Sequence, residues 1–170
     1  MKIRPFAPVL GLVLALSGAV SGAIAGDKAV VVELFTSQGC SSCPPADALL
    51  NELSGRADVI PLALHVDYWD YIGWKDDFAS PAYSERQRNY ARAANKRSVY
   101  TPQMVIAGED HVVGNRPADV QGNLSKNSGQ GNHIDLDVAR NGDRLTIELS
   151  SETSGRDPMV VQVVRYSPKE

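Results

Sequence analysis

The sequence contains two cysteines, and both lie in one short motif. Cys40 and Cys43 are separated by two serines. A zinc site would need a second pair of ligands, and the histidines at 65, 111 and 133 are isolated from one another. A structural disulfide across so short a loop would add little stability, because in the chain-entropy model the stabilisation grows with loop length. The motif therefore indicates thiol–disulfide chemistry, with no metal and no cofactor.

The residues around the motif predict the elements that position it. Residues 29–35 are an apolar run without polar alternation, typical of a strand covered on both faces. Apolar residues recur at helical spacing after Pro44 and predict a helix that ends near Gly55. A second buried strand follows at 59–66. The order strand, CxxC, helix, strand is a βαβ unit with its cysteines at a helix N-terminus, which is a thioredoxin-like arrangement.

The chain up to residue 126 continues this α/β pattern. We expect a second helix from Ser80-Pro81 to about Lys96, a strand at 104–107, its hairpin partner at 112–113 and a last helix at 117–124. Residues 27–126 are therefore predicted to form a thioredoxin-like domain.

This resemblance implies roles for two further positions. In thioredoxin-like folds a cis proline lies against the active-site disulfide just before a strand, and Thr101-Pro102 occupies the corresponding place. Thioredoxins also place a buried acid on the strand before the motif, as a proton acceptor for the second cysteine, and Glu33 matches it. The alternative for Glu33 is an exposed position at the end of the strand.

Two prolines after the motif depart from ordinary thioredoxins. A cysteine before a helix is activated because free N–H groups and the helix dipole favour the thiolate. Pro44 and Pro45 remove two of these donors. The amides of Ser42 and Cys43 and nearby serine hydroxyls are then the expected partners of the Cys40 sulfur. A proline also disfavours a helical conformation in the residue before it, so the helix should begin after the motif.

Three longer segments carry a more specific resemblance. They are VVELFTSQGCSSCPPAD (31–47), HVDYWDYIGWKDDFASPAYSERQRNYA (65–91) and VYTPQMVIAG (99–108). Together they resemble an exported, thioredoxin-like bacterial family of unknown function. Members of that family usually continue well beyond the end of this chain, so the resemblance implies a shortened version or a fragment.

The segment 67–74 holds four aromatic residues and two acids directly after a predicted strand. Ligands of open α/β sheets gather at the carboxyl ends of strands. Tyr68, Trp69 and Trp74, together with Thr101, are therefore candidate substrate-binding residues. The alternative is that the aromatic rings cap the sheet as packing units.

Two groups of polar residues have simpler interpretations. His65 and Asp67 would share one face of a strand and could form a hydrogen bond or a weak metal pair, but a structural histidine is the favoured interpretation. Five basic residues within 86–97 favour a solvated helix face, with an anionic ligand as the alternative.

The C-terminal part changes in composition after residue 126. A linker at 127–132 leads to alternating apolar residues at 133–140, and Asn141-Gly142 is a strong hairpin signal. A third strand is expected at 159–166. Because three strands with one apolar face need cover, we expect a small antiparallel β extension over 132–170 that packs on the preceding domain.

The N-terminus has the pattern of a signal peptide. Lys2 and Arg4 precede an apolar stretch at 9–16, and an A-x-A cleavage site follows at 23–25. The apolar stretch is shorter than the roughly 20 residues of a membrane-spanning helix. Residues 1–25 are therefore predicted to be a signal peptide of a periplasmic or secreted protein with no membrane span.

Composition excludes one class of function, and the motifs leave two hypotheses. The 170 residues carry a formal net charge of −3 and no long basic run, so nucleic-acid binding is not expected. The first hypothesis is a cell-envelope thiol–disulfide oxidoreductase acting on a protein or small-thiol partner. In it Cys40 attacks, Cys43 resolves the mixed disulfide, Glu33 moves protons and Pro102 shapes the substrate groove. The second is a binding or scaffold protein with a permanent disulfide and an aromatic recognition loop. The sequence does not determine the oligomeric state, the substrate or the direction of electron flow.

Overall fold

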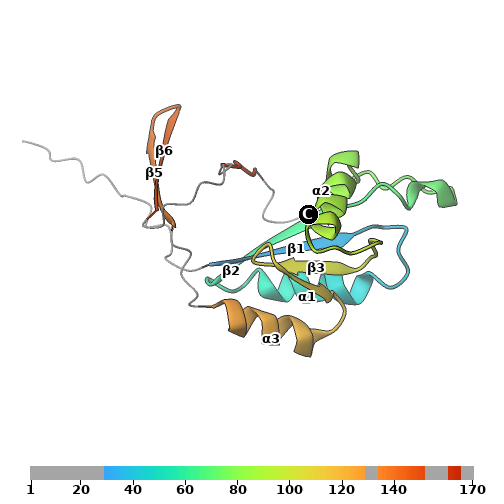
Figure 1. Cartoon of the computed structure of the whole chain (residues 1–170). Coiled ribbons are helices and arrows are strands. Elements are labelled where there is room, and N and C mark those ends of the chain that lie inside the picture. Colours follow the sequence, from blue (N-terminus) through green and yellow to red (C-terminus); the bar gives the residue numbers. More distant parts are fainter. Residues whose placement is uncertain (1–28, 129–133, 152–160, 166–170) are drawn as a thin grey trace, which may run out of the picture.

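The structure is a computed structural model that describes residues 29–128, 134–151 and 161–165 (Figure 1). The expected signal peptide lies outside these residues. Within the described ranges no helix is long and apolar enough to cross a membrane.

The main part of the chain is a mixed α/β unit around a four-stranded sheet with the order β2-β1-β3-β4. The strands are β1 (Val30–Thr36), β2 (Val59–His65), β3 (Gln103–Ile106) and β4 (Asp110–Val113). β1 and β2 are parallel, whereas β3 is antiparallel to both of its neighbours, β1 and β4. A parallel pair needs a crossover connection, and helix α1 (Pro44–Leu53) supplies it. The sequence predicted all of these elements to within a few residues.

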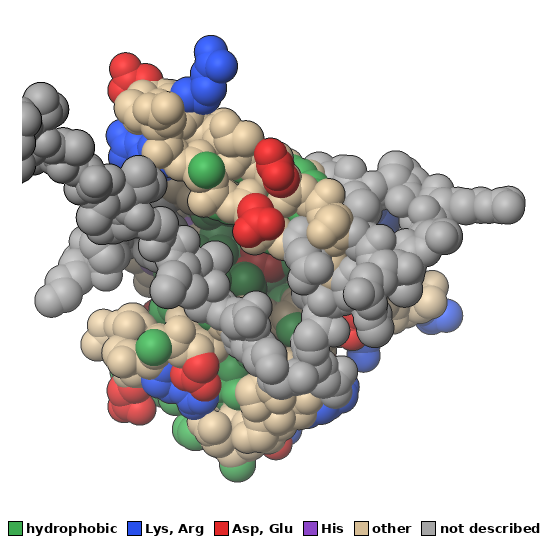
Figure 2. Space-filling view, turned by 90° about the vertical axis from the view of Figure 1, so that its left-hand side faces the viewer, with side chains coloured by type: hydrophobic (Ala, Val, Ile, Leu, Met, Phe, Trp, Pro, Cys, Tyr) green, Lys and Arg blue, Asp and Glu red, His purple; other side chains and the backbone are tan. Residues whose placement is uncertain are grey.

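Helices cover both faces of this sheet (Figure 1). Because successive residues of a strand point to opposite faces, β1 contributes to two separate cores. Val32 and Leu34 pack with α1 and with α3 (Pro117–Asn127), and Phe35 packs on the side of α2 (Pro81–Ala93). Figure 2 shows the molecule from one side, with hydrophobic side chains in the recess between the layers and charged side chains mainly at its edges.

The connection from β2 to α2 holds the aromatic segment and a short 3-10 helix, η1 (Asp70–Ile72). Ser80 then caps α2, because its hydroxyl accepts a hydrogen bond from the Ala82 amide. α2 ends earlier than expected, at Ala93, and Asn95 adopts a left-handed conformation (φ 54°) just after the helix end.

The C-terminal elements form a separate two-stranded antiparallel sheet. Its strands are β5 (Ile134–Asn141) and β6 (Arg144–Ser151). The turn consists of Gly142 (φ 61°) and Asp143, one position later than the predicted Asn141-Gly142 turn. The expectation of a third strand is wrong for residues 161–165, which form neither helix nor strand. The rest of the expected strand lies outside the described residues.

Candidate functional site

Cys40 and Cys43 form a disulfide at the junction of β1 and α1. Their sulfur atoms are 2.11 Å apart and their Cα atoms 5.4 Å apart. Cys40 is 3% exposed and Cys43 is fully buried, so Cys40 is the more accessible of the two only by a small margin. The Cys40 sulfur lies 3.6 Å from the Ser42 hydroxyl oxygen, one of the partners that the sequence predicts. The disulfide is therefore formed and almost wholly covered.

The amides in the first turn of α1 are used within the helix. The helix begins at Pro44, directly after the motif as expected. The Ala46 and Asp47 amides both donate to the Cys43 carbonyl oxygen, at 2.8 and 3.1 Å. These bonds hold Cys43 in a helical conformation (φ −78°, ψ −34°), so the expectation that the following proline keeps this residue non-helical is wrong.

The Thr101-Pro102 peptide bond is cis, which confirms the expectation. Pro102 is buried, and its carbonyl accepts a hydrogen bond of 3.0 Å from the Gly114 amide. A Cβ atom on Gly114 would lie 3.2 Å from Ala46 Cβ and 3.3 Å from Pro102 Cβ. The proline loop and the first turn of α1 therefore approach the same point, and glycine is the residue that permits this approach.

The aromatic segment bridges the two loops around the disulfide. The Trp69 indole N–H donates to the Thr101 hydroxyl at 2.8 Å. The Trp74 indole N–H donates to Gln38 Oε1 at 3.1 Å, two residues before Cys40. The segment also presses on the turn itself, because a Cβ on Gly39 would lie 3.1 Å from a side-chain carbon of η1 and 3.1 Å from Trp69 Cβ. The segment thus caps the end of the sheet, as the packing alternative requires.

The three aromatic residues predicted to bind substrate differ in exposure. Tyr68 and Trp69 are half-buried, and the Tyr68 hydroxyl donates to Gln87 on α2 at 3.1 Å. Trp74 is 61% exposed. Tyr71 is 80% exposed and stacks on Trp69 with ring centroids 6.4 Å apart. The accessible aromatic surface beside the cysteine turn therefore comprises Trp74 and Tyr71.

Asp76 holds this arrangement together, and the sequence analysis missed it. It is 1% exposed, and its Oδ2 accepts hydrogen bonds from the Gln38 amide at 2.8 Å and from His65 Nδ1 at 2.7 Å. Its Oδ1 accepts from the Phe78 amide at 3.0 Å. Burial raises the pKa of Asp76, but these hydrogen bonds outweigh burial and leave the pKa below its ordinary value. His65 is thus a structural histidine. Its partner is Asp76, whereas the shared strand face had suggested Asp67.

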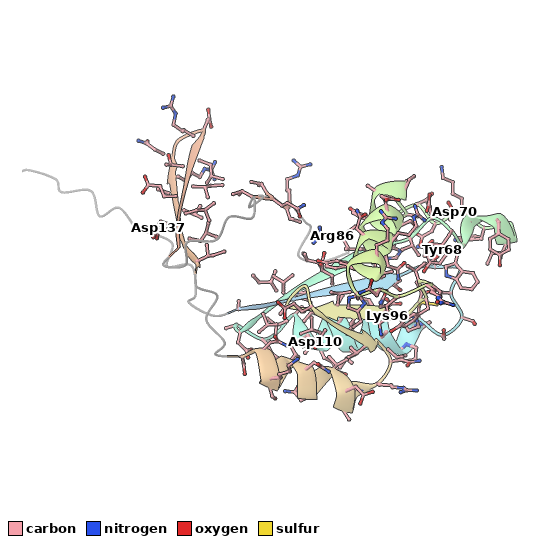
Figure 3. The ribbon with its side chains drawn as sticks, in the orientation of Figure 1. Tyr68, Asp70, Arg86, Lys96, Asp110 and Asp137 are labelled. Carbon is pink, nitrogen blue, oxygen red and sulfur yellow. A yellow bond between two sulfur atoms is a disulfide. The ribbon has the colours of Figure 1, made fainter. Side chains whose placement is uncertain are left out.

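Glu33 is buried, at 3% exposure, but not where the resemblance to thioredoxins puts it. Its carboxylate accepts hydrogen bonds from Arg86 at 2.6 and 3.0 Å and from the Tyr90 hydroxyl. Both partners are on α2, and the labelled Arg86 in Figure 3 lies on the α2 side of the sheet. Burial and the neighbouring carboxylate raise the pKa of Tyr90, which keeps it a phenol donor. The expectation that Glu33 lies beneath the disulfide is therefore wrong. Successive residues of β1 point to opposite faces of the sheet, and Glu33 points away from α1.

A different carboxyl group lies on the α1 side. Asp47 is four residues after Cys43, so the two share a helix face. The buried Thr36 at the end of β1 donates its hydroxyl to Asp47 Oδ1 at 2.7 Å. Although Asp47 as a whole is exposed, partial burial of its carboxyl group raises its pKa, and the Thr36 hydrogen bond offsets only part of this shift.

Comparison with known proteins places the chain in a family. Residues 31–170 match the family described as Protein of unknown function (DUF1223). The chain belongs to DUF1223. The chain is similar to a crystal structure of a structural-genomics target protein from Agrobacterium tumefaciens, with 44% sequence identity and a TM-score of 0.65. The match covers 74% of this DUF1223 chain and 58% of that protein, so this chain spans little more than half of its length. Among curated proteins, none matches.

Membership in DUF1223 confirms one part of that expectation, namely that the family is one of unknown function. Within the residues that the structure describes, no group of three or more His, Cys, Asp and Glu side chains could hold a metal ion.

Proposed function

We propose that this DUF1223 chain is a thiol–disulfide oxidoreductase with a thioredoxin-like fold. The observation that carries the proposal is the Cys40–Cys43 disulfide at the strand–helix junction, with the cis Pro102 packed towards the first turn of the same helix. The sheet order β2-β1-β3-β4 and the position of the cis proline directly before β3 support the fold assignment.

The reaction is a pair of exchange steps at sulfur. A substrate thiolate attacks Cys40 Sγ, the Cys40–Cys43 bond breaks, and Cys43 leaves as a thiolate that takes up a proton. A second substrate thiolate then attacks the substrate sulfur of the mixed disulfide and releases Cys40 as a thiolate. The substrate dithiol is oxidised by two electrons and the cysteine pair is reduced by two. The same steps in reverse reduce a substrate disulfide.

The structure supplies groups for these steps. The Ser42 hydroxyl, 3.6 Å from Cys40 Sγ, can donate to the thiolate. Asp47, on the helix face of Cys43 and with a raised pKa, takes the proton-transfer role that the sequence suggested for Glu33. Thr101 bonds to Trp69, and Trp74 bonds to Gln38 just before the motif; Thr101 and Trp74 are the proposed contacts for a protein or small-thiol partner.

The proposed location is the cell envelope or the exterior. The N-terminal pattern of residues 1–25 supports export. A disulfide is consistent with an oxidising compartment.

The test is the reduction potential of the Cys40–Cys43 pair, measured by equilibration of the full chain with glutathione buffers. A reversible potential above about −300 mV is expected for a redox-active pair. The Cys43→Ser variant should trap a mixed disulfide with a thiol probe through Cys40, whereas the matched Cys40→Ser variant should trap less because its remaining sulfur is fully buried. A pair that is reduced only after unfolding contradicts the proposal.

A binding or scaffold protein is the second candidate, and the burial of Cys40 favours it. In that case the disulfide is structural and the exposed rings of Tyr71 and Trp74 recognise a partner. A potential well below about −300 mV, together with no mixed disulfide in Cys43→Ser, would support this candidate over the enzyme.

A further inference from the structure

A chain of polar side chains crosses the α2 side of the sheet and ends at His111. The Tyr68 hydroxyl donates to Gln87 Oε1 at 3.1 Å. Gln87 Nε2 donates to the backbone oxygen of Tyr100 at 2.8 Å and to Gln103 Oε1 at 2.7 Å. Gln103 Nε2 lies 3.2 Å from His111 Nδ1. Both glutamines are buried, and the redox chemistry proposed above uses neither of them.

These contacts fix the donor and the acceptor of each hydrogen bond in this row of polar side chains. The backbone oxygen of Tyr100 can only accept, so the group of Gln87 that faces it is the NH₂ group. The same NH₂ group faces Gln103 Oε1, which leaves the Gln103 NH₂ group to donate to His111 Nδ1. A ring nitrogen that accepts carries no proton. Neutral His111 therefore has its proton on Nε2.

His111 lines a small hollow whose other walls supply hydrogen-bond donors. The hollow has a volume of about 160 Å³ and is lined by Lys96, Arg97, Ser98, Tyr100, Gln103 and His111. None of these six residues is a carboxylate. In the described part of the chain, no hydrogen bond or ion pair engages the side chains of Lys96 and Arg97. Figure 3 labels Lys96, which follows the C-terminal end of α2.

The two acids that precede His111 in the sequence do not line this hollow. Asp110 accepts hydrogen bonds from Lys126 at 2.9 Å and from Asn127 at 2.8 Å. Glu109 lines an adjoining hollow of about 250 Å³ that shares His111. Burial, with the nearby charge of Lys96, lowers the pKa of His111, and Asp110 opposes the shift only in part. These effects favour the neutral ring, whose Nε2–H can act as a donor.

We propose that this hollow binds a small oxyanion, held by the Lys96 ammonium, the Arg97 guanidinium and the His111 Nε2–H. Carboxylate and phosphate oxygens accept such charge-assisted hydrogen bonds, and a guanidinium matches them with two parallel donors. A volume of about 160 Å³ suits a phosphate ion or a short carboxylate. The site is independent of the proposed redox function, because no sulfur atom takes part in it.

The test is a titration of the ¹⁵N-labelled full chain followed by NMR. Inorganic phosphate and succinate are added separately at constant ionic strength, with sodium chloride as the balancing salt. We expect saturable shifts of the His111 ring nitrogens and of the Gln103 side-chain amide. The Lys96→Ala/Arg97→Ala variant should bind at least about tenfold more weakly, because two charge-assisted contacts are lost. Arg144→Gln removes an exposed positive charge on β6 and is the matched control with unchanged binding.

The His111 tautomer is a second, independent measurement. The ¹⁵N shifts of the ring should show the proton on Nε2. His111→Gln, which can place an amide donor near Nε2, should retain more binding than His111→Asn. Saturation by phosphate alone or by succinate alone supports the proposal and identifies the class of oxyanion. Shifts that rise linearly with either anion, equal binding by the double variant, or a proton on Nδ1 would overturn it.

Discussion

Removal of Arg86 is the sharpest test of how the sheet and α2 are held together. Arg86 donates two hydrogen bonds to Glu33, which is 3% exposed, and the Arg86 side chain itself is 36% exposed. Arg86→Met keeps most of the apolar stem and leaves the Glu33 carboxylate with Tyr90 as its remaining side-chain donor. Loss of one partner from a buried pair costs about 3–5 kcal/mol. Because water reaches the exposed part of Arg86, we expect a smaller cost, about 2–3 kcal/mol.

The other corners of the double-mutant cycle follow from the same burial. Glu33→Gln leaves a guanidinium that water can partly solvate, so it should cost about 1–2 kcal/mol. The double variant Glu33→Gln/Arg86→Met has no buried charge and should be more stable than Arg86→Met alone. Urea unfolding of the oxidised full chain measures these differences. Arg88→Met is the matched control, since Arg88 is exposed and pairs with the exposed Glu85, and its effect should stay within about 0.5 kcal/mol.

Two results would refute this reasoning. A cost of less than about 1 kcal/mol for Arg86→Met would mean that the carboxylate does not depend on the guanidinium. A changed reduction potential of the Cys40–Cys43 pair in Glu33→Gln would mean that Glu33 communicates with the disulfide despite its place on the other face of the sheet.

Three shorter predictions concern the candidate site. Burial raises the pKa of Asp47, so ionisation of this carboxyl group lowers the stability of the fold as pH rises through that pKa. In urea unfolding, Asp47→Asn should therefore be more stable than the parent protein at pH 7 but not at pH 3. A difference that does not depend on pH would contradict this. Gly114→Ala should lower stability by about 1–3 kcal/mol in thermal unfolding, because its methyl group meets Pro102; an unchanged Tm would refute the close approach. Trp69→Phe should cost about 1 kcal/mol in urea unfolding through loss of its bond to Thr101, and no loss would argue against that bond.

The sequence predicted the local elements well because their signals are local. The apolar run of β1, Pro44 at the start of α1 and Ser80 before α2 act within a few residues of the positions they determine. The hairpin turn was displaced by one residue, since Asn141 and Gly142 can both serve in more than one turn position.

The polar contacts of the site were harder to predict because they join distant parts of the chain. The strand pattern showed that Glu33 needs a partner, and the partner, Arg86, comes from a helix whose basic face was predicted to be mainly solvated. Asp76 stands in the run Lys75-Asp76-Asp77, which has the composition of an exposed loop. Its burial follows from the folding of the whole aromatic segment onto Gln38, and no short-range pattern carries that information.

The central place of β1 has a consequence for biosynthesis. β1 pairs with β3, so Val32 meets Ile106 only after the chain between them has been made. At roughly 5–20 residues per second of synthesis, the cysteines emerge several seconds before Pro102 does. The two cysteines are three positions apart in the sequence, whereas the cover from Trp69 and the proline loop comes from residues that are made later. Until this cover has formed, both thiols are open to oxidants that the finished protein largely excludes.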